Sequence, residues 1–108
     1  ESAASDVYKR QIPNLPNNSC VEVPCVVQKD DLVPQVVPPL PIHLANLIQT
    51  NISVQQLTVE ALKTRKKDSI YYAAMLDPHT AGELNLDQIW KMVDELIDAH
   101  GSMLPAFK

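Results

Sequence analysis

Apolar and polar residues alternate between residues 20 and 27. The order C-V-E-V-P-C-V-V places alternate apolar side chains on one face, which is the pattern of a half-buried strand. A second run rich in β-branched residues follows at 32–37, and the four polar residues at 28–31 suit a hairpin turn. We therefore expect an antiparallel β-hairpin. Pro24 and Pro34 cannot donate hydrogen bonds to a ladder, so we expect them on open edges or at bulges.

The segment 42–64 predicts one long helix. Its apolar residues recur at helical spacing without a helix breaker, and the preceding Pro41 is well placed to open a helix. These residues cover more than one face: Leu44, Leu47, Ile48, Ile52, Val54, Leu57, Val59, Ala61 and Leu62. At about 1.5 Å per residue the helix would be roughly 35 Å long, which exceeds the needs of so small a globule. We therefore expect a helix buried on several sides, partly by surface outside this chain.

The remaining residues predict shorter helices with recognisable ends. Asp68 is placed to cap the first of them, and Asp77-Pro78 has the order of an N-cap followed by proline at the first helical position. Asn85 and Gln88 have the spacing of a capping box.

The helix that follows Asn85 is predicted to be amphipathic. One stripe is apolar and ends in a histidine: Leu86, Ile89, Trp90, Val93, Leu96, Ile97 and His100. Gly101 is expected to stop this helix, with Pro105 as a breaker beyond it. The predicted fold class is therefore α+β: a β-hairpin, a long buried helix, short helices and an amphipathic C-terminal helix.

Composition limits the possible functions. With 108 residues, the chain has room for one small domain or a piece of a larger one. Its only glycines are Gly82 and Gly101, so it contains neither a dinucleotide-binding G-x-G-x-x-G turn nor a phosphate-binding loop. The net charge of −4 argues against nucleic acid as a partner. No apolar run approaches the ~20 residues that cross a bilayer, so we expect a soluble cytoplasmic protein without membrane contact.

The reactive and charged residues have structural explanations. Cys20 and Cys25 have no convergent histidine, and we expect buried or structural thiols. The basic run 63–67 follows a helix end and is expected to be solvated. The same is expected of the acidic residues on the polar side of the last helix, Asp94, Glu95 and Asp98. The sequence therefore assigns no catalytic, cofactor-binding or metal-binding residue.

The three histidines also have structural explanations. His79 is expected in a partly exposed loop, and His100 at a helix C-terminus, where a cation is favourable. His43 lies in the first turn of the long helix, at the positive end of its dipole. It is the histidine with the strongest claim to a functional role.

Several segments together resemble one enzyme family. They are N-L-P-x-N-x-C-V-E-V-P-C at 14–25, T-N-I-S-V-Q-Q-L-T-V-E-A at 50–61, Y-A-A-M-L-D-P-H-T-A at 72–81 and D-E-L-I-D-A-H-G at 94–101. Their order and spacing resemble the C-terminal end of family-4 glycoside hydrolases, in the α-galactosidase (melibiase) branch, over residues 12–105. Residues 1–11 resemble an adaptor artefact and are expected to be disordered and foreign, and 106–108 form a tail.

The resemblance implies the tail of a C-terminal α/β domain like that of lactate and malate dehydrogenases. Its partner would be the Rossmann domain of a longer parent chain. It implies hydrolysis of α-galactosides by NAD-dependent oxidation, elimination, addition and re-reduction, with a divalent metal, typically Mn²⁺. It also implies assembly as a homo-oligomer.

The resemblance places the catalytic, NAD-binding and metal-binding residues of the family upstream of the matched region. The chain alone is therefore expected to be inactive and to bind neither cofactor. Two speculative sugar-contacting residues remain, Asn51 in the long helix and His43. α-Glucosides and α-galacturonides remain alternative substrates. The alternative function is that of a free-standing helical protein-interaction module.

Overall fold

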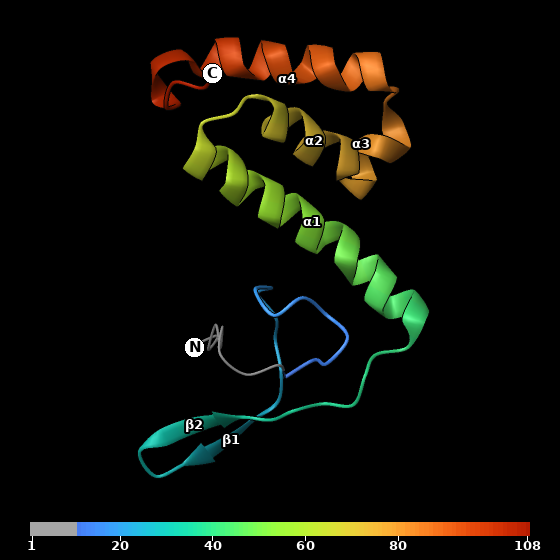
Figure 1. Ribbon diagram of the computed structural model, residues 1–108, viewed down its shortest axis with the longest axis vertical. Coiled ribbons are helices and arrows are strands. Elements are labelled where there is room, and N and C mark those ends of the chain that lie inside the picture. The colour runs from blue at the N-terminus through green and yellow to red at the C-terminus, as the bar shows by residue number, and fades with distance from the viewer. Residues whose placement is uncertain (1–10) are drawn as a thin grey trace. The chain divides into compact units, whose positions relative to one another are not determined.

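The computed structural model describes residues 11–108 (Figure 1). Residues 1–10, which make up most of the expected foreign head, lie outside the described residues. The elements in chain order are β1 (Cys25–Gln28), β2 (Asp31–Pro34), α1 (Ile42–Thr64), α2 (Asp68–Leu76), α3 (Pro78–Glu83), α4 (Leu86–His100) and the 3₁₀ turn η1 (Gly101–Met103). The chain divides into two compact units, and the boundary between them along the sequence falls within α1, between Gln49 and Thr50. This architecture confirms the predicted α+β class.

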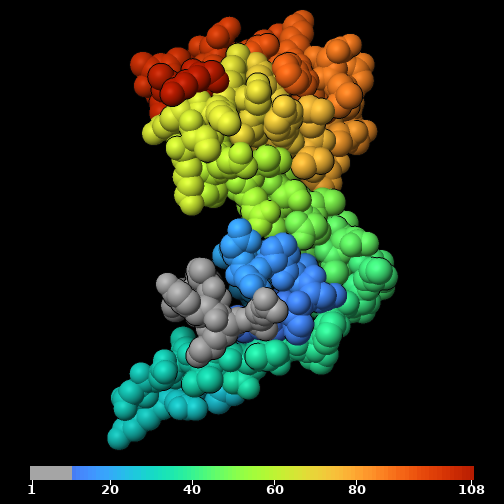
Figure 2. Space-filling model, viewed as in Figure 1, coloured from blue at the N-terminus to red at the C-terminus, as the bar shows by residue number. Residues whose placement is uncertain are grey.

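The predicted hairpin is confirmed, although its strands are shorter than expected. β1 and β2 pair antiparallel from Cys25↔Pro34 to Gln28↔Asp31, which leaves a two-residue turn. The second predicted strand was extended to Val37, but the amide of Val37 donates instead to the Gln11 carbonyl at 2.8 Å. The strand residues lie largely in solvent, and Figure 2 shows the hairpin open on its visible face.

The first unit is held together by contacts between residues distant in sequence. Asn14 donates from Nδ2 to the Leu40 carbonyl at 2.8 Å and accepts from the Leu40 amide at 2.9 Å. Leu15 and Ala45 are buried in this unit. The Asn14 side chain thus bonds both backbone polar groups of Leu40, which lies between two prolines and cannot join a regular β-ladder.

Helix α1 begins and ends at the predicted residues. The Pro41 carbonyl accepts from the Ala45 amide at 3.0 Å, which closes the first turn. The prediction of burial on several sides relied partly on surface outside this chain, and within the chain only Ala45, Ile52 and Ala61 of α1 are buried. Six of its large apolar side chains are exposed: Ile42, Leu44, Leu47, Ile48, Val59 and Leu62.

Helix α2 starts without the predicted cap. Asp68 is the first helical residue rather than the cap, and Lys67, which precedes it, makes no side-chain capping bond. Instead the C-terminal tail holds this junction, because Lys108 donates to the Arg65 carbonyl at 2.7 Å and accepts from the Lys67 amide at 2.9 Å. The residues assigned to a tail are thus paired with the link between α1 and α2.

The caps of α3 and α4 are confirmed. The Asp77 side chain accepts from the Thr80 amide at 2.8 Å, with proline at the first helical position. Asn85 and Gln88 exchange both hydrogen bonds of a capping box, at 2.9 and 3.0 Å. Gly101 ends α4 with φ of 48°, in the left-handed region that favours glycine.

The core of the second unit lies where α2 and α4 pack together. Ile89 and Val93 of α4 are 1% and 4% exposed, and Tyr71 of α2 is 5% exposed. The predicted apolar stripe of α4 is only partly covered, because Leu86, Trp90 and Leu96 remain exposed. The stripe therefore supplies both a core face and an apolar surface.

Candidate functional site

The two predicted sugar-contacting residues both lie on α1. His43 is in its first turn and Asn51 is further along, and both are exposed. Neither lines the cavity described below. Their role in sugar binding stays a prediction.

Several residues lie elsewhere than predicted. Cys20 and Cys25 were expected to be buried or structural thiols, but both are free and exposed, and the strand that carries Cys25 is exposed along its whole length. His79 lies within α3 rather than in a loop, since the Asp77 cap starts that helix two residues earlier. Neither correction creates a nucleophile or a ligand set.

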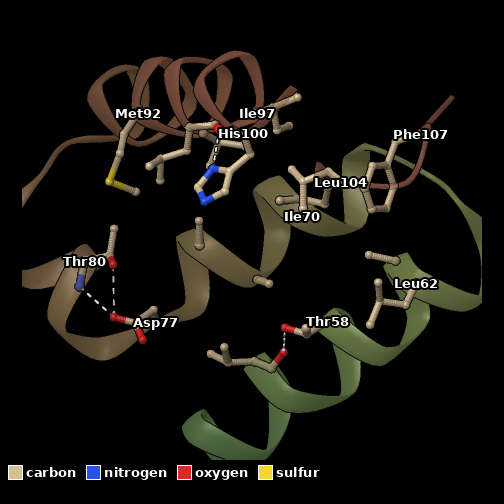
Figure 3. Close-up of a pocket in the computed structure, with 16 residues that line it drawn as sticks. Thr58, Leu62, Ile70, Asp77, Thr80, Met92, Ile97, His100, Leu104 and Phe107 are labelled. Atoms are coloured by element: carbon tan, nitrogen blue, oxygen red, sulfur yellow. Dashed lines mark hydrogen bonds between the residues drawn. The ribbon is translucent and has the colours of Figure 1, made fainter. Parts of the chain in front are cut away.

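An apolar cavity of about 460 Å³ lies within the second unit. As Figure 3 shows, Thr58 and Leu62 of α1, Ile70 of α2, Met92, Ile97 and His100 of α4, and Leu104 and Phe107 of the tail surround it. The sequence did not predict this cavity, because its walls come from segments that are distant along the chain. The size is within the range of small-ligand sites.

Polar side chains at the cavity, those of Thr58, Asp77, Thr80 and His100, each make a hydrogen bond within the chain. The Thr58 hydroxyl donates to the Val54 carbonyl at 2.8 Å, and the Thr80 hydroxyl lies 3.0 Å from Asp77 Oδ1. His100 Nδ1 is 2.6 Å from the Leu96 carbonyl and must donate, because a carbonyl only accepts. Hydrogen bonds from Thr80, first from its amide and then from its hydroxyl, hold the pKa of Asp77 below its ordinary value. Because most of the residues that line the cavity are apolar, it suits an apolar group better than a sugar.

A second cluster joins α2 to α4. Lys67 Nζ is 2.8 Å from Asp94 Oδ1, and the Tyr71 hydroxyl donates to the same oxygen. The Tyr71 ring stacks on Trp90, with centroids 4.1 Å apart and planes 10° from parallel. Lys67 and Asp94 were both expected to be solvated, and their side chains are 38% and 52% exposed, but the sequence did not predict that they bond to each other. Packing of α2 on α4 brings them together across 27 positions of sequence.

Lys67 and Asp94 each stabilise the charged form of the other. The hydrogen bond from Lys67, followed by that from Tyr71, holds the pKa of Asp94 below its ordinary value of 3.8. The bond to Asp94 in turn raises the pKa of Lys67 above its ordinary value of 10.5. Both side chains are substantially exposed, so the pair orients the helices more than it stabilises them.

The lowered pKa of Asp94 predicts a pH dependence. Because folding lowers this pKa, the contribution of the carboxylate to stability is complete above about pH 4 and disappears as the pH falls through the lowered value. We expect Asp94→Asn to reduce the loss of thermal stability between about pH 4 and pH 2. Differential scanning calorimetry across this range measures the effect. Asp98→Asn on the same helix is the charge-matched control, and an equal change in that variant would contradict the role of the Lys67–Asp94 contact.

The described residues do not fit NAD or a catalytic metal. Among residues 11–108, no three His, Cys, Asp or Glu side chains gather in a way that could hold a metal ion. The two glycines of the chain are 19 positions apart and cannot form a dinucleotide-binding turn. No step of a reaction is therefore assigned to these residues. In the part of the chain that the structure describes, no helix has the length and apolar character to cross a membrane.

Comparisons with known proteins agree with the fold. The model of the family 4 glycosyl hydrolase C-terminal domain matches residues 8–80. The chain is 48% identical over 97 residues to an alpha-galactosidase of Bacillus subtilis (strain 168), covering 90% of this chain and 22% of that protein. It is 31% identical over 96 residues to the "Probable 6-phospho-beta-glucosidase" of the same strain, covering 89% and 21%. It is 27% identical over 95 residues to an alpha-galacturonidase of Lachnoclostridium phytofermentans, covering 88% and 20%.

These matches confirm the family that the sequence motifs resemble. The chain belongs to the family 4 glycosyl hydrolases and corresponds to their C-terminal domain. It spans about a fifth of the length of the curated relatives that it matches.

Proposed function

We propose that this chain acts as the C-terminal domain of an α-galactosidase. The observation that carries the proposal is its 48% identity, over 90% of the chain, to the alpha-galactosidase of Bacillus subtilis. Identity to the alpha-galacturonidase is 27% over a similar length. This difference favours an α-galactoside over an α-galacturonide as the substrate.

The proposed enzyme uses NAD and a divalent metal, typically Mn²⁺, and hydrolyses its substrate in the cytoplasm. The described residues do not fit either cofactor, so we propose that other parts of the enzyme hold them. Under this proposal the 108-residue chain has no hydrolase activity by itself. Its contribution is structural: it would supply packed helices and a hairpin that complete the domain.

The partners in this proposal are the rest of a parent chain, with a Rossmann domain, and further copies of the same enzyme. Exposed apolar side chains on α1, such as Leu47 and Leu62, support such contacts. Burial of large apolar side chains against another surface is favourable in free energy, because it removes them from water. The alternative function, a free-standing helical protein-interaction module, also predicts association through these side chains.

A chimeric enzyme tests the proposed function. The matching 22% of the Bacillus subtilis alpha-galactosidase is replaced by this chain, and hydrolysis of p-nitrophenyl α-D-galactoside is followed with NAD and Mn²⁺ added. We expect activity in the chimera, little activity toward the corresponding α-glucoside and α-galacturonide, and none in the 108-residue chain alone.

Two controls sharpen this experiment. The unmodified Bacillus subtilis enzyme sets the full activity, and a chimera that carries the matching segment of the 6-phospho-beta-glucosidase tests whether any family member suffices. A folded but inactive chimera with this chain would contradict the proposal and favour the interaction module. Hydrolysis by the chain alone would contradict its structural role.

A further inference from the structure

The apolar cavity of the second unit is lined by three helices and is open to solvent. Leu62 of α1, Ile70 of α2 and Ile97 of α4 all face it (Figure 3). Leu62 and Leu96, which both line the cavity, are 50% and 48% exposed in this chain. Covering apolar side chains of this kind is favourable in free energy, because it removes them from water.

The walls of the cavity favour a helix as its occupant. Peptide groups within α1, α2 and α4 bond inside their own helices, so these walls offer no row of backbone partners to an inserted strand. The hydroxyls of Thr58 and Thr80 likewise bond acceptors of this chain. A helix needs no such partners, because its own peptide groups bond internally, and its apolar face can lie against an apolar surface.

The two ends of the cavity differ in charge. Asp77 and Thr80 lie at one end, whereas Leu62 and Phe107 lie at the other (Figure 3). The basic run 63–67 follows Leu62 directly. A helix carries partial positive charge at its N-terminus and partial negative charge at its C-terminus. Its dipole is therefore complementary to both ends of the cavity when its N-terminus lies toward Asp77.

We propose that the cavity receives an apolar helix from the remainder of the parent enzyme, with the N-terminus of that helix toward Asp77. This chain spans 22% of the length of the alpha-galactosidase that it matches at 48% identity, so about four fifths of such an enzyme lie outside it. The existence of a parent chain rests on the proposed function, whereas the lining and the charges of the cavity do not.

Photo-crosslinking within the chimeric enzyme tests the proposal. p-Benzoylphenylalanine replaces Leu96 in the chimera, and peptide mass spectrometry identifies the segment that reacts with it on irradiation. We expect one peptide, from the Bacillus subtilis portion of the same polypeptide. The same group at Met92 should react nearer the N-terminus of that peptide than the group at Leu62, because Met92 lies toward the Asp77 end (Figure 3).

Thiol labelling gives a second measurement with a smaller substitution. Leu96→Cys is expected to react with N-ethylmaleimide at least about tenfold more slowly in the chimera than in the 108-residue chain, because the helix covers it. Lys91→Cys is the matched control on α4, since the Lys91 side chain is 78% exposed and does not line the cavity. It should react at the same rate in both proteins.

Three results would overturn the proposal. They are equal labelling rates of Leu96→Cys in the two proteins, a cross-link from Leu96 to a second copy of the chain, and a reversed order of the Met92 and Leu62 cross-links. The proposed function fails separately. An active chimera with equal labelling rates contradicts only the helix in the cavity, whereas a folded but inactive chimera contradicts the proposed function at any labelling rate.

Discussion

Ile89→Ala is expected to destabilise the second unit by about 2–5 kcal/mol. Ile89 is 1% exposed and lies on the face of α4 that packs against the rest of this unit. Truncation removes buried methyl and methylene groups and leaves a cavity that the adjacent helices can only partly fill. This loss is a large fraction of the stability of a chain of this size. Urea unfolding followed by circular dichroism at 222 nm measures it.

Leu86→Ala is the control for this prediction. Leu86 begins the same helix and carries the same number of side-chain carbons, but it is 58% exposed. We expect a change within about 0.5 kcal/mol, since little apolar surface is returned to water. Equal effects of the two substitutions would show that α4 does not pack through Ile89.

Tyr71→Ala is expected to cost about 3–5 kcal/mol, as truncations of large buried aromatic residues do. Tyr71 is 5% exposed, stacks on Trp90 and donates its hydroxyl to Asp94. Its removal takes away core volume, the aromatic pair and one of the two hydrogen bonds at Asp94. The emission of Trp90 should shift to longer wavelength, because the indole loses the Tyr71 ring that covers one of its faces.

Tyr71→Phe separates the ring from the hydroxyl. Phenylalanine keeps the stacked ring and the buried area and removes only the bond to Asp94, which still accepts from Lys67 at 2.8 Å. We expect a much smaller loss of stability and an unchanged tryptophan emission. If Tyr71→Phe were as destabilising as Tyr71→Ala, the hydroxyl and not the packed ring would hold α2 against α4.

Local motifs made the helices predictable. The Asp77 cap accepts from Thr80, and Asn85 pairs with Gln88, so each motif is complete within four consecutive residues. The bounds of α1 were likewise predictable, from apolar periodicity after Pro41. The family was predictable for a related reason, since the motifs are read along the chain.

The candidate site was much less predictable. Cys25 shares one face of the predicted strand with Val21, Val23 and Val27, a pattern that indicates burial only if another element covers that face. The cavity, the bond between Lys67 and Asp94 and the stack of Tyr71 on Trp90 all join residues distant in sequence. A pattern along the chain shows which side chains share a face but does not show which faces meet.

Hydrogen bonds and periodicities within a few residues therefore set the class of the fold, the helix ends and the family from sequence alone. Packing decided which apolar residues are buried, so Ile89 lies in the core while Trp90, one position later, is 42% exposed. It also paired the C-terminal Lys108 with Arg65 and Lys67. The physical reason is that burial depends on surface supplied by other segments, whereas a helix cap needs only its own neighbours.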